Sequence, residues 1–174
     1  METFEKLLNK SYRFLSYRPR SEKELMDYLI KKTSFSKIKE GEERQNLESV
    51  INSIIKKLKE QKFLDDKEFA KWWIEQRSKA RPKSLKFIIF ELKRKGIGKD
   101  LVEEILENKD FEVISDFDKA LALAQKRLAR YKRQDPKKFY EKMARFLASK
   151  GFDFDIIKKV IDQISPKRYN TDRQ

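Results

Sequence analysis

The sequence contains no cysteine and no histidine. Their absence excludes disulfide bonds, zinc sites built from these residues, thiolate nucleophiles and imidazole acid–base catalysis. An enzyme that uses only carboxylates remains compatible with the composition. There is also no P-loop, no glycine-rich phosphate cradle and no activated nucleophile, so the sequence offers no positive signal for catalysis or for a bound cofactor.

Long apolar runs are missing as well. The longest notable run, residues 87–90, is far below the ~18 residues that a membrane span needs. Residues 1–5 carry acidic side chains where a signal peptide has a basic segment. We therefore expect a soluble, cytoplasmic protein with no membrane contact.

Glycine and proline are scarce, with four of each, and no stretch alternates apolar and polar residues over the length of a sheet strand. These features favour an all-helical fold whose helix ends can be located from the sequence. Polar residues at helix starts and glycines at helix ends mark the boundaries. The expected caps are Ser21 with Glu24, Asp65 with Glu68, Asp135 before Pro136, Gly96 and Gly151.

One helical pattern occurs three times along the chain. Each copy has an amphipathic first helix (7–15, 69–80 and 120–131), a middle helix that opens at 18–21, 81–84 or 135–136, and a shorter third helix (50–58, 101–106 and 156–164). A single copy has few apolar positions, so neighbouring copies must pack together to complete a core. The sequence therefore predicts an all-α fold of three tandem three-helix repeats, stacked into a curved, elongated molecule.

The repeats are expected at 1–62, 63–110 and 111–164. The first copy has Thr33 where the others have glycine, and it carries an additional polar segment, which predicts a loop insertion near 34–46. Residues 165–174 include Pro166 and almost no apolar side chain, so we expect a flexible C-terminal tail.

Positive charge dominates the composition. Lysine and arginine number 43 against 29 acidic residues, which gives a formal net charge of +14. Such an excess attracts polyanions, of which nucleic acid is the commonest inside cells. The alternative is that the lysines only cover solvated helix faces.

The basic residues gather at the turn between the first and middle helices of each repeat. Equivalent turns in stacked repeats could form one ridge along a phosphate backbone, although each could also be only a solvated turn. The third repeat has the strongest excess of positive charge. The candidate nucleic-acid and partner-binding residues are Arg18, Arg20, Arg77, Lys79, Arg81, Lys83, Lys86, Arg127, Arg130, Lys132, Arg133, Lys137, Lys138 and Arg145.

Two other groups of residues have a structural and a functional interpretation. The acids Asp65, Asp66 and Glu68 could hold Mg²⁺ or act in acid–base catalysis, but their place at a helix start favours capping. Trp72 and Trp73 could stack on bases. Adjacent helical residues point about 100° apart, so we expect at least one of the two tryptophans to face the core.

Several segments together resemble one bacterial family. The segments are FLDDKEFA (63–70), Gln76-Arg77 and ELKRKGI (91–97), with RPRS (18–21) upstream and FLASKGF (146–152) downstream. They resemble the RecX regulatory proteins over residues 8–164.

The resemblance implies a non-enzymatic modulator of the RecA recombinase, which acts in homologous recombination, DNA repair and the SOS response. Such a protein lies in the groove of the RecA filament on single-stranded DNA and inhibits its recombination, ATPase and strand-exchange activities. The resemblance implies the filament and single-stranded DNA as partners and leaves binding to duplex DNA open. It implies a protein that needs no cofactor or metal, and we expect a monomer. The alternative is a helix-turn-helix or sequence-tolerant DNA-binding protein that acts independently of RecA.

Overall fold

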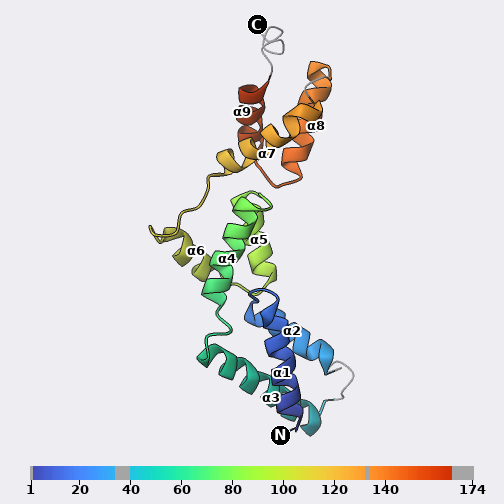
Figure 1. Ribbon diagram of the computed structural model, residues 1–174, viewed down its shortest axis with the longest axis vertical. Helices are drawn as coiled ribbons and strands as arrows, with labels where there is room; N and C mark the ends of the chain where they lie inside the picture. The colour runs from blue at the N-terminus through green and yellow to red at the C-terminus, as the bar shows by residue number, and fades with distance from the viewer. Residues whose placement is uncertain (1, 34–39, 132–133, 166–174) are drawn as a thin grey trace. The chain divides into compact units, whose positions relative to one another are not determined.

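The computed structural model describes residues 2–33, 40–131 and 134–165, which are helical with no strand (Figure 1). Within these residues no helix combines the length and apolarity of a membrane span. The all-α prediction is confirmed. The helices are α1 (Glu2–Ser16), α2 (Glu22–Lys32), α3 (Glu42–Glu60), α4 (Asp66–Lys79), α5 (Leu85–Arg94), α6 (Lys99–Glu107), α7 (Asp116–Tyr131), α8 (Pro136–Ala148) and α9 (Phe154–Ile164).

The chain divides into two compact units, and the boundaries between them fall within α4, α5 and α6. The first unit comprises Met1–Trp72 with Leu92–Ile105, and the second comprises Trp73–Glu91 with Leu106–Gln174. Because the boundaries cut through the middle repeat, each unit contains one connection between neighbouring repeats.

In the first unit, α1, α2 and α3 enclose one apolar core. Leu25, Leu29, Ile54 and Leu58 have no exposed surface. Leu25 and Leu29 are four residues apart on α2 and Ile54 and Leu58 four apart on α3, so each pair forms a single apolar stripe. Leu7 of α1 completes the contact.

In the second unit, α7, α8 and α9 form the corresponding core. Ala120 and Ala124 are the fully buried apolar residues of α7 in this core. These small side chains let Phe139 and Met143 of α8 and Ile161 of α9 fill the space beside α7.

The middle repeat supplies apolar residues to both units. Phe69 and Leu92 are buried in the first unit, and Ile74 and Ile88 are buried in the second. Trp73 is only 9% exposed, which confirms the expectation that at least one of the adjacent tryptophans is a core residue.

The predicted helix caps at Ser21, Asp135, Gly96 and Gly151 are confirmed. Ser21 and Glu24 form a capping box at the start of α2, and the Asp135 carboxylate accepts bonds from two backbone N–H groups in the first turn of α8. Gly96 and Gly151 have φ of 86° and 87°, a conformation that side chains other than glycine rarely adopt.

The loop predicted near 34–46 is wrong over its last five residues, because α3 begins at Glu42. Gly41 precedes this helix, and Glu42 and Glu43 place negative charge in its first turn, where it complements the unpaired N–H groups. Charge and end effects therefore extend the helix well beyond its apolar stripe. The rest of this insertion (34–39) and the predicted tail beyond Ser165 lie outside the described residues.

Candidate nucleic-acid interface

The first unit contains the connection between the first two repeats, built at the start of α2. The Ser21 hydroxyl donates to the carbonyl oxygen of Lys95 at 2.7 Å, and the Glu22 N–H donates to Asp66 Oδ1 at 2.8 Å. Asp65 caps its own helix α4, as expected, by accepting from Lys67 N–H at 2.8 Å. Asp66, which was also predicted to cap α4, instead caps α2.

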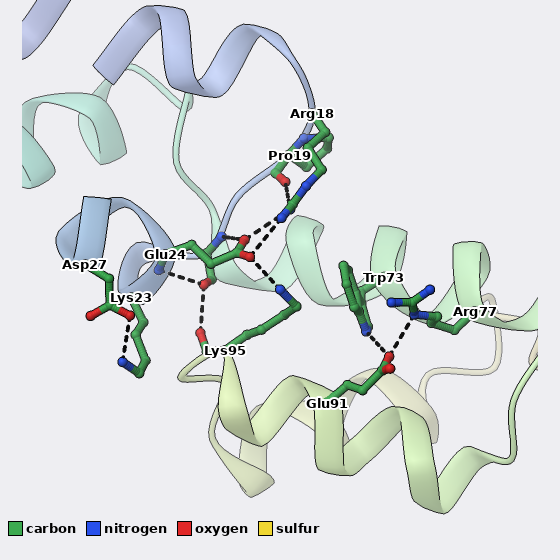
Figure 2. A network of polar contacts seen from close by, with 10 residues as sticks. Arg18, Pro19, Lys23, Glu24, Asp27, Trp73, Arg77, Glu91 and Lys95 are labelled. Carbon is green, nitrogen blue, oxygen red and sulfur yellow. Dashed lines mark hydrogen bonds and ion pairs between the residues drawn. The ribbon is translucent and has the colours of Figure 1, made fainter. Parts of the chain in front are cut away.

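A half-buried carboxylate, Glu24, strengthens this connection. Burial would raise the pKa of Glu24, but hydrogen bonds from Arg18 and Lys95 and their positive charges lower it to about 2. Figure 2 shows the hydrogen bonds that Arg18 and Lys95 donate to the Glu24 carboxylate. Because the pKa is depressed in the folded state, the stabilisation is present above the unfolded value near 4.5 and is lost as pH falls toward 2.

The second unit repeats this connection at the start of α5. The Ser84 N–H donates to the carbonyl oxygen of Lys150 at 3.1 Å, and the Leu85 N–H donates to Asp116 Oδ1 at 2.9 Å. Asp116 follows Asp66 by fifty residues and has the same role. Its charge is balanced by Lys119, which is 2% exposed and lies 2.6 Å from the carboxylate.

The basic turn of the second repeat is held by another carboxylate, Glu91. Glu91 accepts from Trp73 Nε1 at 3.1 Å and Arg77 Nε at 2.7 Å, as Figure 2 shows, and also from Lys83 Nζ at 2.5 Å. Burial opposes ionisation, but the hydrogen bonds from Lys83 and Arg77 prevail and lower the pKa of Glu91. Two of the five basic residues predicted to bind a polyanion here are therefore neutralised internally.

The third repeat has an aromatic ring where the second repeat has this carboxylate. The Arg127 guanidinium lies 4.1 Å from the centre of the Phe146 ring and donates to the Tyr131 hydroxyl at 3.1 Å. Beside these side chains is an open pocket of about 620 Å³ between α7 and α8. It is lined by Arg130, Tyr131, Gln134, Lys142, Arg145, Phe146 and Ser149.

The spacing of the chain shows that these two arrangements occupy the same place in the repeat. Arg77 and Arg127 each follow the capping aspartate, Asp66 or Asp116, by eleven residues. Glu91 and Phe146 each precede the terminal glycine by five. The first repeat fills the corresponding positions with Phe14 and Tyr28, whose rings stack with centres 4.1 Å apart.

Models of one protein family match all three repeats. They are described as the first, second and third three-helix domains of RecX, and they match residues 8–33, 65–106 and 115–161. The regulatory protein RecX of Clostridioides difficile is 30% identical over 163 residues, which are 94% of this chain and 70% of that protein. The chain belongs to the RecX family.

Other RecX proteins are similar over most of the chain. That of Bacillus velezensis is 34% identical over 91% of this chain and 55% of its own length. The chain spans a little over half the length of several of the curated RecX relatives it matches. A crystal structure of RecX from Lactobacillus salivarius superposes with a TM-score of 0.63 at 27% identity, covering 94% of this chain and 97% of that one. These matches and the helix order confirm tandem three-helix repeats.

In this chain, the predicted basic residues of the first turn are partly engaged within the protein. Arg18 forms an ion pair with Glu24 at 2.8 Å. The Arg20 guanidinium lies 4.1 Å from the centre of the Phe14 ring, and burial, followed by the charge of Arg18, lowers its pKa. Both cations therefore contact other side chains of the protein and are not fully solvated.

The remaining predicted residues fall into three groups. Lys79, Arg81 and Lys86 of the second repeat are exposed, as are Arg130, Lys137, Lys138 and Arg145 of the third. Arg127 is half-buried behind the pocket wall. Lys132 and Arg133 lie outside the described residues.

Sequence reasoning did not select five of the residues that line the pocket, namely Tyr131, Gln134, Lys142, Phe146 and Ser149. The available signal was the helical spacing on α8, where Lys142, Phe146 and Ser149 recur at i, i+4 and i+7 and so share one face. Whether the three basic turns form one continuous ridge remains a prediction.

Proposed function

We propose that this chain regulates the RecA recombinase, binding its filament on single-stranded DNA and inhibiting recombination, ATP hydrolysis and strand exchange. The observation that carries the proposal is the match of all three repeats to RecX domains, together with relatives that are named regulatory proteins. The action we propose is binding without catalysis, by a cytoplasmic monomer whose repeats span residues 1–62, 63–110 and 111–164.

The charge distribution supports a partner rich in phosphate. The net charge of +14 favours association with a nucleoprotein filament. Lys137 and Lys138 are exposed at the start of α8, next to the pocket helix face that carries Lys142 and Arg145. Exposed cations of this kind contact phosphates and fix position without reading sequence.

Co-sedimentation with RecA filaments and RecA-dependent ATP hydrolysis on single-stranded DNA test the proposal. We expect the wild-type chain to sediment with the filament and to suppress hydrolysis. The variant Lys137→Glu/Lys138→Glu should weaken both effects at physiological salt, because it reverses the local field. Lys158→Glu/Lys159→Glu on α9 is the matched control, since it makes the same charge change at two exposed lysines of the same repeat.

A wild-type chain that neither sediments with the filament nor suppresses hydrolysis would refute the proposal. Protection of one defined duplex sequence in a footprinting experiment, without any effect on RecA, would instead support a DNA-binding protein that acts independently of the recombinase.

A further inference from the structure

The pocket of the third repeat combines two kinds of side chain that a nucleotide requires. Arg130, Lys142 and Arg145 supply positive charge, and Tyr131 and Phe146 supply aromatic rings. Among the described residues that line it, none is acidic. Its volume of about 620 Å³ lies within the range of about 300 to 1,000 Å³ typical of small-molecule sites.

The aromatic wall is held in place from behind. Arg127 lies over the Phe146 ring at 4.1 Å and donates a hydrogen bond to Tyr131 at 3.1 Å, so one guanidinium bridges α7 and α8 and orients both rings. The Ser149 hydroxyl donates to the Phe146 carbonyl oxygen at 2.7 Å and closes the last turn of α8. Arg127 is thus a positioning residue rather than a phosphate contact.

We propose that this pocket binds one nucleotide unit of single-stranded DNA. The phosphate is held by Arg130, Lys142 and Arg145, and the base packs against Tyr131 and Phe146. The inference rests on the proposed function for its partner and adds the site, the mode of contact and the repeat that provides it. Each base presents a π face, so such a site tolerates any sequence.

Two other places in the molecule lack this combination. The second repeat has Glu91 in place of Phe146, and this carboxylate neutralises Arg77 and Lys83. A hollow of about 430 Å³ along α3 contains Glu48 and Lys56 together and has no aromatic residue in its lining. Within the described part of the chain, the α7–α8 pocket is therefore the better match for a phosphate and a base.

The aromatic rings favour a single strand over other polyanions. In a duplex the bases are stacked inside, where a flat side chain on a helix face cannot reach them without unstacking. An acidic peptide would satisfy the three cations but would leave the rings without a matching partner. The pocket therefore predicts that bases, and not phosphates alone, contribute to affinity.

The first test measures fluorescence anisotropy with a labelled oligo(dT) of about 16 nucleotides and no recombinase. Arg130→Glu/Arg145→Glu should weaken binding at least tenfold at physiological salt, because two phosphate contacts become repulsive. Lys158→Glu/Lys159→Glu, with the same change in charge, should weaken it less than about threefold. Equal losses in the two variants would overturn the site and leave only a general electrostatic attraction.

The second test changes the ligand instead of the protein. An abasic strand of the same length retains the phosphates and should bind the wild-type chain about tenfold more weakly than oligo(dT). Phe146→Leu retains an apolar side chain and should remove most of this preference, with circular dichroism to confirm that the variant is folded. Equal wild-type affinity for the abasic strand, for a duplex of the same length or for a poly-aspartate peptide would refute the base-packing site.

These measurements contain no RecA, so the two proposals can fail separately. A chain that binds oligo(dT) through the pocket but does not suppress RecA-dependent hydrolysis would retain this site and refute the proposed function. A chain that suppresses RecA-dependent hydrolysis but shows no base preference would retain the proposed function and refute this site.

Discussion

The second and third repeats have different types of side chain at the same position of the repeat. Five residues before the terminal glycine, the second repeat has Glu91 and the third has Phe146. The carboxylate binds Arg77, Lys83 and Trp73 inside the repeat. The ring instead contacts Arg127, and the cations on the pocket side remain exposed. At this position the second repeat has a carboxylate that neutralises two cations of its basic turn, whereas the third repeat has a ring, and no acidic residue lines its pocket.

The largest expected effect comes from giving the third repeat the chemistry of the second. Phe146→Glu places a carboxylate beside Arg127, removes the ring and adds negative charge to the pocket. We expect affinity for oligo(dT) to fall about 100-fold, which corresponds to about 3 kcal/mol. Anisotropy titrations measure it, and Phe146→Leu is the control that separates loss of the ring from gain of the charge.

If Phe146→Glu bound oligo(dT) as tightly as Phe146→Leu, a carboxylate at this position would not neutralise the cations of the pocket. The comparison between the two repeats would then have to be explained by their backbone rather than by this position.

The next largest effect is on stability and comes from removing the negative charge of Glu91 in the second repeat. Glu91→Gln leaves Arg77 and Lys83 without their counter-charge in a half-buried place, so the free energy of unfolding should fall by about 2 kcal/mol. Urea denaturation measures the change. Glu103→Gln is the control, because its ion pair with Lys99 is exposed to solvent and should contribute far less to stability.

The pH dependence sharpens this result. Because the folded-state pKa of Glu91 is lowered, its contribution is present above the ordinary value near 4.5 and disappears as pH falls below it. The difference in stability between the wild type and Glu91→Gln should therefore narrow on acidification, to about 1 kcal/mol or less. A difference that stayed constant with pH would show that the carboxylate stabilises by packing rather than by charge.

The smallest expected effect tests whether the connections between neighbouring repeats are equivalent. Gly96→Ala and Gly151→Ala each force a side chain into a positive-φ conformation, with the added carbon 2.7 Å from Lys23 Cβ or Ser84 Oγ. Both should cost about 1 to 2 kcal/mol in thermal or urea unfolding. Gly98→Ala, where the added carbon meets open space, should change stability by less than about 0.5 kcal/mol. Unequal losses at 96 and 151 would argue against equivalent connections.

Much of the fold could be predicted because its signals are local. The stripe of Leu25 and Leu29, the capping box at Ser21 and the glycines at 96 and 151 each depend on residues within one or two turns. The threefold repeat could be predicted from the sequence for the same reason. The start of α3 was not, because Glu42 is stabilised at a helix end without any apolar periodicity.

The candidate site was predictable only in part. Sequence reasoning found Arg130 and Arg145 from the excess of basic residues in the third repeat, but it treated Arg77 and Lys83 as equivalent to them. It also assigned Asp66 to its own helix, whereas the structure pairs it with the N–H of Glu22. In each case the partner lies eight or more residues away in the sequence, and its distance in space cannot be read from composition.

The sequence by itself determined the helices, their caps and the threefold repetition, because hydrogen bonding and amphipathic spacing act over a few residues. Only the tertiary structure decided which cations are neutralised and which face solvent, because a charge is stabilised by whatever lies within a few ångströms of it. Fourteen residues separate Arg77 from Glu91, yet they lie 2.7 Å apart. Arg130 and Arg145 are no different in chemistry, but they line an open pocket instead.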